Sequence, residues 1–198
     1  MKDELKFLLI DTSIENITNI LLVLGDKISN VSYNESRAHL KNLIPGIKEI
    51  LQKNNLEISD LNFVAINEGP GSWTGLRIGF ATIKVFSLLN KIPLITFSSF
   101  DLIFVKNKIH DGIMLIKSSD TNFYYCIVEK QEIIKKGIIS GFELLNKYPS
   151  EEKYYLEEDE KLIISLVIKK FNDGNFADIY DVEPDYITEG LITSKFEK

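Results

Sequence analysis

Between Thr74 and Asn90 the sequence carries charge only at Arg77 and Lys84. A helix over this segment is apolar on every side, and such a helix has to be covered on every side. The segment is too short and too interrupted to cross a bilayer. It therefore predicts a helix with one side on its own sheet and the other covered by either the same domain or a partner chain. The apolar side chains are Leu76, Ile78, Phe80, Ala81, Ile83, Val85, Phe86, Leu88 and Leu89.

A glycine-rich loop, residues 67–75, precedes this helix and follows a predicted strand. Ser72 or Thr74 can cap the helix through a side-chain oxygen. Bare N–H groups and the helix dipole at such a turn can cradle an anion. The register nevertheless excludes a P-loop, a dinucleotide fingerprint and a nucleophile elbow, because Leu76, Thr74 and Trp73 stand where those motifs need lysine, glycine and serine. The loop alone is therefore no proof of chemistry.

Two further features of the predicted helices suit a contact with another chain. Gly75 and Gly79 lie four residues apart on one helical face, which lets a second helix approach closely. Of the 23 basic residues only Arg37 and Arg77 are arginines, and both fall in or beside the first two predicted helices. A planar guanidinium suits a carboxylate, carbonyl or phosphate partner, and with only two cases coincidence is the alternative.

The composition limits the classes of protein. With 198 residues the chain has room for one large domain or two small ones. A formal net charge of −6 argues against strong RNA binding by the chain alone, since phosphate contacts depend on lysine and arginine. The single cysteine, Cys126, excludes an internal disulfide, and its strand-like setting favours a buried, inert thiol over a nucleophile. Because the N-terminus lacks the shape of a signal peptide, a soluble cytoplasmic protein is expected.

The first half of the chain reads as a strand meander followed by alternating helices and strands. Gly25 and Asp26 mark a hairpin turn, and Pro45 with Gly46 predicts a kink in the first helix. Ser98 or Ser99 can cap a helix after the last strand. The predicted strands are 7–10, 19–24, 27–33, 61–66 and 93–97, and the predicted first helix is 36–53.

The second half repeats this pattern in a poorer form, which suggests a duplication. The chain then divides into an N-terminal lobe, residues 1–107, and a smaller C-terminal lobe with a tail, residues 108–198. The predicted strands of the second half are 113–116, 123–129, 133–139 and 153–156, and its helices are 141–146 and 160–171.

Two small groups of polar residues have open interpretations. Asp11, Thr12 and Ser13 follow the first strand, where they can receive a nucleotide's phosphate and metal or merely close a turn through side-chain hydrogen bonds. His39 lies near the start of the first helix, and the only other histidine, His110, is far away in the sequence. No paired-histidine metal motif exists, so His39 is interpreted as a polar contact at the helix end.

A combination of motifs resembles the TsaB (YeaZ) family. The resemblance is long and specific over residues 7–105 and thin afterwards, and relatives carry phenylalanine at the position of Trp73. It implies an α/β, duplicated actin- and hexokinase-like (ASKHA) fold with two lobes, the second of them reduced. The motifs are Leu9–Ser13, the helix with His39, Gly69–Gly79, Ile92–Ile95 with Ser98 and Ser99, and Pro184–Ile187.

The resemblance also implies a non-catalytic subunit that pairs with the catalytic protein TsaD and works with the ATPase TsaE. Together they transfer a threonylcarbamoyl group from threonylcarbamoyl-adenylate to the adenosine beside the anticodon of tRNAs that read codons beginning with A. ATP and metal are expected on the partner subunits and no cofactor on this chain. The tRNA is expected to be met only through the complex, with no membrane involved. A homodimer is expected when the partner is absent.

The residues implied to contact the partner lie on the first two predicted helices and on the glycine-rich loop that precedes the second of them. A catalytic cleft is not implied, because Lys117 takes the second-half position of Asp11 and no adjacent glycines follow Gly112. The partner-binding set is His39, Leu40, Leu43, Gly71, Ser72, Trp73, Thr74, Gly75, Arg77, Ile78, Gly79 and Thr82.

The sequence departs from the family in its second half, and other functions are alternatives. Relatives tend to carry Asp-Ala-Arg where this chain has Lys117–Ser119, and the terminal pattern ends in Ile187 and Thr188. These departures weaken the expectation that the second half of the chain contacts TsaE. A stand-alone ASKHA-type ATPase or kinase that uses Asp11 is the main alternative. A peptidase is disfavoured, since neither a metal pair nor a serine, histidine and acid set stands at motif spacing.

Overall fold

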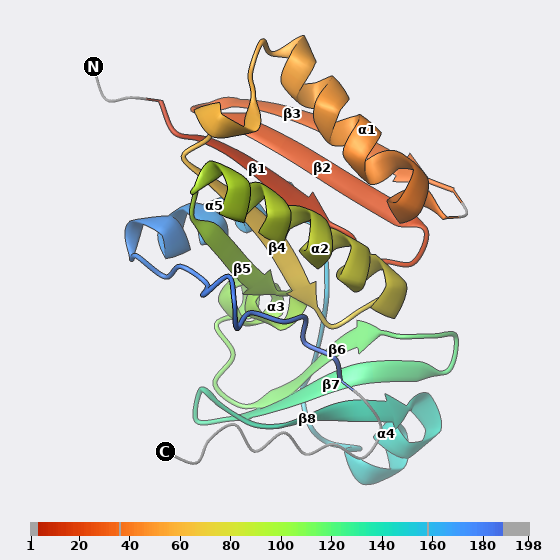
Figure 1. The fold of residues 1–198 in the computed structure, drawn as a ribbon. Helices are drawn as coiled ribbons and strands as arrows, with labels where there is room; N and C mark the ends of the chain where they lie inside the picture. Colours follow the sequence, from red (N-terminus) through yellow and green to blue (C-terminus); the bar gives the residue numbers. More distant parts are fainter. Residues whose placement is uncertain (1–3, 36, 158, 188–198) are drawn as a thin grey trace. The chain divides into compact units, whose positions relative to one another are not determined.

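The computed structural model describes residues 4–35, 37–157 and 159–187, which form two compact units (Figure 1). Among these residues, unit 1 comprises those of 4–97 together with 165–184, and unit 2 comprises those of 98–164 together with 185–187. The predicted polar tail, residues 188–198, lies outside the described residues. Each unit is built on one sheet of its own.

The observed units differ from the division at residue 107 expected from the sequence. The helix after Ser98 belongs to unit 2, where it packs on β6 and β9. Residues 165–184 return to unit 1, where the Phe171 ring stacks on Phe63 at 4.6 Å between centroids. Residues 165–184 therefore belong to unit 1 through aromatic packing between residues far apart in the sequence.

Unit 1 holds a five-stranded sheet in the order β3-β2-β1-β4-β5. The pairs β1–β2 and β2–β3 are antiparallel, and β1–β4 is parallel. The unit's elements are β1 (Lys6–Asp11), β2 (Ile17–Leu24), β3 (Lys27–Asn34), α1 (Ala38–Lys53), the 3-10 helix η1 (Ile58–Asp60), β4 (Phe63–Gly69), α2 (Trp73–Asn90), β5 (Leu94–Ser98) and the end of α5 (Glu160–Asn172).

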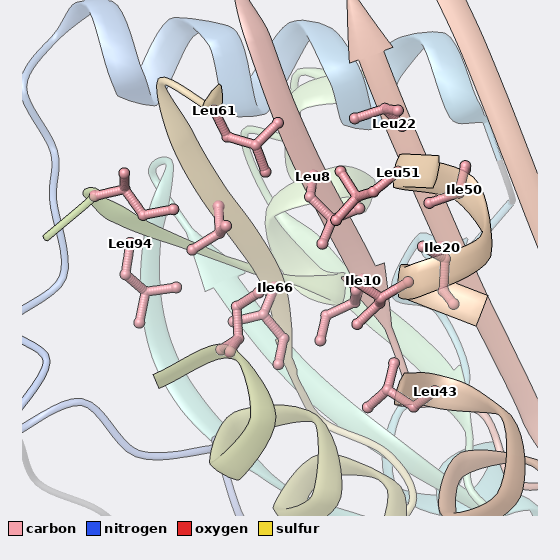
Figure 2. Packing of buried hydrophobic residues seen from close by; sticks show 14 of the residues in the cluster. Leu8, Ile10, Ile20, Leu22, Leu43, Ile50, Leu51, Leu61, Ile66 and Leu94 are labelled. Atoms are coloured by element: carbon pink, nitrogen blue, oxygen red, sulfur yellow. The ribbon is translucent and has the colours of Figure 1, made fainter. Parts of the chain in front are cut away.

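Alternate residues of the central strands point to opposite faces of this sheet, as the pleat requires. Leu8 and Ile10 of β1 join Leu43 and Ile50 of α1 in one apolar cluster (Figure 2). Helix α2 contributes Phe80 and Ile83 to the same cluster. On the other face, Phe7 stacks on Phe63 at 4.5 Å, and Phe171 of α5 continues the stack. Helices α1 and α2 therefore share one face of the sheet, and α5 covers the other.

Helix α1 continues through Pro45 as one helix, in agreement with the single helix predicted over residues 36–53, and the predicted kink stays a prediction. Apolar side chains on both sides of the proline, among them Leu43 and Ile47, are buried in the same cluster. This packing holds both halves of the helix against one sheet. Its stabilisation exceeds the cost of the hydrogen bond that proline cannot donate.

Unit 2 repeats the arrangement with a four-stranded sheet in the order β8-β7-β6-β9, in which β6 and β9 are parallel. Lys117 ends β6 as Asp11 ends β1. Within the described residues this sheet has no counterpart of β5, so the second unit is reduced. Its elements are α3 (Ser99–Asn107), β6 (Gly112–Lys117), β7 (Asn122–Glu129), β8 (Glu132–Ser140), α4 (Gly141–Lys147), β9 (Lys153–Tyr155) and the start of α5.

Candidate functional site

The glycine-rich loop ends in a serine cap on α2. The Ser72 hydroxyl accepts a hydrogen bond from the Gly75 N–H at 3.3 Å, so Ser72 and not Thr74 is the N-cap. The Ser72 N–H donates to the Ser13 carbonyl oxygen at 2.6 Å. Two of the N–H groups at this helix start are therefore used within the chain, and that of Ser72 ties α2 to the turn after β1.

Gly75 and Gly79 serve this same contact inside unit 1. A Cβ atom at Gly75 would overlap the Thr12 carbonyl oxygen and lie 2.8 Å from His39 Nε2, and one at Gly79 would overlap the Thr12 hydroxyl. The sequence predicts that the two glycines let another helix approach closely. The structure corrects this prediction, because the close neighbour is the turn after β1.

The Asp11 side chain closes that turn. One carboxylate oxygen accepts from the Ser13 N–H at 2.8 Å, and the other accepts from Asn67 Nδ2 at 2.9 Å. Asn67 in turn accepts from the Gly69 N–H at 2.9 Å through its side-chain oxygen. Asn67 was not predicted, although an amide near the end of a buried strand is a signal for it. Phosphate binding by Asp11, Thr12 and Ser13 stays a prediction without a test.

His39 is the second residue of α1, and its side chain is buried. Its Nδ1 lies 2.9 Å from the Thr18 hydroxyl. Within the described residues, His39 Nε2 and the Thr12 hydroxyl are buried side-chain atoms without a hydrogen-bond partner. Burial lowers the pKa of His39 from its ordinary value, against a smaller opposing effect of Asp11. The described ranges contain no group of three side chains that could hold a metal ion.

The lowered pKa of His39 makes stability fall in mild acid. The folded state binds the histidine proton more weakly than the unfolded chain, so stability is lost as pH falls below the unfolded pKa of about 6.5. The free energy of unfolding should therefore fall between about pH 7.5 and about pH 5.5, by up to about 1.4 kcal/mol per unit of lowering. Urea titrations of wild type and His39→Asn measure this, and the variant should show a flatter profile.

His110→Asn is the matched control, because the His110 side chain is mostly exposed. It removes the other histidine of the chain and leaves the contact between His39 and Thr18 in place. An equal loss of slope in both histidine variants would contradict the assignment to His39.

The outer surface of α1 and α2 exposes six large apolar side chains, which we call the α1–α2 face. The two helices contact each other along the same side of the sheet (Figure 1). Leu89 is 73% exposed, Leu40 71% and Val85 50%. The Arg77 guanidinium lies over the Trp73 ring, 5.3 Å from its centroid, a cation–π contact. The members of the face are Leu40, Ile44, Trp73, Val85, Leu88 and Leu89.

The predicted partner-binding residues fall into three classes of exposure. The exposed ones are Leu40, Trp73, Thr74 and Arg77. The half-buried ones are Gly71, Ser72, Ile78 and Thr82. The last four are buried within unit 1 and support the two helices without forming their outer surface: His39, Leu43, Gly75 and Gly79.

Four members of the α1–α2 face are absent from that predicted set, although the sequence holds a signal for the three that lie on α2. A helix that is apolar on all sides must have apolar residues on the side away from its sheet. Spacings of three and four residues from Trp73 lead to these outer positions on α2. The four are Ile44, Val85, Leu88 and Leu89.

Cys126 is a free thiol that is buried within β7. Burial raises its pKa to about 12, so the reactive thiolate is not populated near neutral pH. The inert, buried cysteine predicted from the sequence is confirmed. Within the described ranges, no helix is both long and apolar enough to span a bilayer.

A family model described as "TsaD: tRNA N6-adenosine threonylcarbamoyltransferase" matches residues 27–170. The chain is 27% identical to the tRNA threonylcarbamoyladenosine biosynthesis protein TsaB of Buchnera aphidicola subsp. Acyrthosiphon pisum, over 85% of this chain and 77% of that relative. The chain belongs to the TsaB (YeaZ) family. A second TsaB relative, from Haemophilus influenzae, is 33% identical, and the match spans 48% of this chain and 40% of that relative.

Solved structures agree with membership of the TsaB family at the level of the fold. YeaZ from Pseudomonas aeruginosa superposes with a TM-score of 0.67 at 14% identity, covering 92% of this chain and all of that one. An uncharacterized Pseudomonas aeruginosa protein with similarity to peptidase YeaZ gives a TM-score of 0.70 at 15% identity, covering 92% and 99%. With two related sheets, the second smaller, the predicted two-lobed ASKHA-like fold is confirmed.

Proposed function

We propose that this chain is a non-catalytic adaptor in tRNA threonylcarbamoyladenosine biosynthesis, and that it docks a TsaD-like subunit on the α1–α2 face. The TsaB relatives carry that biosynthetic role in their names. The docking proposal rests on one observation, the exposure of six large apolar side chains on two adjacent helices. Contiguous apolar patches on soluble monomers usually mark interaction sites.

In this proposal the chemistry belongs to the partners. A TsaE-like ATPase joins through the complex, and the tRNA is met only there. The threonylcarbamoyl group passes from threonylcarbamoyl-adenylate to the adenosine beside the anticodon of tRNAs reading codons that begin with A. ATP and metal are held by the partner subunits, and this chain orients the catalytic subunit.

The site geometry favours an adaptor over a stand-alone ATPase or kinase. Both Asp11 carboxylate oxygens already accept hydrogen bonds, from Ser13 and Asn67. At the matching position of the second sheet stands Lys117, a cation in place of a second carboxylate. An actin- or hexokinase-like cleft uses acidic turns from both halves to hold a metal nucleotide, and here one half lacks its acid.

A smaller apolar patch on α4 competes for the role of docking surface. Phe142 is 78% exposed and Leu145 65%. Helix α4 has seven residues, so it presents a contact of about two turns. The α1–α2 face offers three times as many large apolar side chains on two long helices. We therefore place the TsaD-like subunit on α1 and α2.

The direct test mixes the full chain with the TsaD-like subunit of the same organism. Gel filtration with light scattering should give a complex of one copy of each chain. Calorimetry of the chain alone with ATP and magnesium should give no binding heat. Failure of the two proteins to associate, or tight nucleotide binding by the chain alone, would overturn the proposal.

A further inference from the structure

The charge of the two outer helices is opposite in sign to that of the whole chain. Residues 37–53 and 73–91, which are α1 and α2 with adjoining cap residues, hold seven basic residues and one acidic residue. Their formal charge is +6, whereas that of the whole chain is −6. The basic residues are Arg37, Lys41, Lys48, Lys53, Arg77, Lys84 and Lys91.

Several of these cations border the α1–α2 face. Lys48 is exposed and follows the exposed Ile44 by one helical turn. Arg77 follows Trp73 by one turn and lies over its ring. Lys41 is also exposed. A chain that docks on these apolar side chains therefore meets basic residues on both helices.

Two other cations are held within the chain, and so is the single carboxylate. Lys84 donates to the Val182 carbonyl oxygen at 3.0 Å. Glu49 is paired with Lys53 at 2.6 Å and accepts from the Tyr33 hydroxyl at 3.4 Å, on the side of α1 toward β3. Within these two segments Glu49 is the single carboxylate, and its contacts with Lys53 and Tyr33 place it on the β3 side of α1.

From this charge pattern we infer that the α1–α2 face selects a different protein whose facing surface is apolar and carries an excess of carboxylates. The inference rests on the proposed function and adds the chemistry of the partner surface. A two-fold homodimer through this face places each positive helix pair against the other. Like charges brought together across an interface cost several kcal/mol, whereas opposite charges speed association and fix its specificity.

Two other occupants fit this face less well, one because of charge and one because of side-chain type. Self-association, which the apolar face predicts when no partner is present, is opposed by charge and is the weaker equilibrium. RNA would meet mainly aliphatic side chains, with Trp73 the one aromatic member of the face. Aliphatic side chains cannot stack on bases, and such stacking supplies much of single-strand binding.

The test compares two equilibria as salt is raised, by sedimentation velocity and calorimetry on the full chain. Between about 0.1 M and about 1 M salt the Debye length falls from about 10 Å to about 3 Å. The dissociation constant of the complex with the TsaD-like subunit should rise about tenfold or more over this range. Self-association of the chain alone should strengthen or stay unchanged.

Charge reversal at Lys48 tests the acidic-partner inference independently of the proposed adaptor function. Lys48→Glu should weaken the complex with the TsaD-like subunit about tenfold and leave self-association unweakened. Lys161→Glu, on the exposed surface of α5, makes the same change in net charge away from the face and should alter neither equilibrium.

The possible outcomes are distinct. A complex that forms but responds neither to salt nor to Lys48→Glu overturns the acidic-partner inference and leaves the adaptor proposal standing. No complex at any salt concentration overturns both. Binding of unmodified tRNA by the chain alone, if lost in Lys48→Glu, shows that the positive charge serves a nucleic acid and also overturns the inference.

Discussion

Val85→Asp should weaken the complex with the TsaD-like subunit about 100-fold or more, a loss of at least about 2.7 kcal/mol. Val85 is half exposed on α2 and is not part of the apolar cluster beneath the helix. In the complex its replacement would bury an unpaired carboxylate, which is strongly unfavourable. In the free chain the carboxylate stays in water, and valine and aspartate have similar helix propensities. The free energy of unfolding should therefore change by only about 0.5 kcal/mol.

Ile134→Asp is the matched control for this prediction. Ile134 is 52% exposed on β8 of unit 2, against 50% for Val85, so both changes place a carboxylate at an equally exposed apolar position. Calorimetric titrations of the two variants against the TsaD-like subunit should differ by about 100-fold. Equal affinities of the two variants would contradict docking on the α1–α2 face.

Gly75→Ala should lower the free energy of unfolding by about 2 kcal/mol or more. The added Cβ would overlap the Thr12 carbonyl oxygen, a backbone atom that cannot move without shifting the turn after β1. Overpacking costs about 1–3 kcal/mol and falls at the upper end when backbone must shift. The helix-propensity gain of alanine, about 1 kcal/mol, offsets only part of this cost. Denaturant unfolding of the chain alone measures the difference.

Gly46→Ala is the control for Gly75→Ala. Gly46 is also a buried helical glycine, but its added Cβ would meet the ends of two side chains, Ile20 at 2.7 Å and Tyr33 at 2.8 Å. These ends can move, so the strain and the propensity gain should nearly cancel, to within about 1 kcal/mol. Equal losses for the two variants would contradict a specific role of Gly75 in seating α2 on the turn.

The order of helices and strands could be predicted because most elements carry strong local signals. The apolar run from Phe7 to Ile10 marks β1, and Gly25 with Asp26 marks the hairpin that follows β2. Ser98, one of the two predicted caps, caps α3 in a capping box with Asp101. Each of these signals acts within a few residues, so no tertiary information is needed.

The features that escaped prediction depend on contacts between distant residues. One is the turn after β1, which is the close neighbour of Gly75 and Gly79. The return of residues 165–184 to unit 1 depends on Phe171 stacking against Phe63, a pairing that periodicity does not specify.

The candidate site was predictable in its location and less so in its members. The absence of a polar side on α2 indicates that its outer surface needs a cover, whatever the rest of the chain does. Which neighbour Gly75 and Gly79 approach could not be read from spacing, because periodicity assigns residues to a face and says nothing about what packs there. The structure places the turn after β1 against them. They therefore seat the helix, while residues such as Val85 and Leu88 remain outside.

Trp73 gives the most direct test of docking on α1 and α2, because it is the single tryptophan of the chain and a member of the α1–α2 face. The chain is labelled with 5-fluorotryptophan, and its one fluorine resonance is followed as unlabelled TsaD-like subunit is added. We expect the resonance to shift and broaden in proportion to complex formation. An unchanged resonance, while the two proteins coelute as a complex, would place the interface elsewhere and contradict a docking role for α1 and α2.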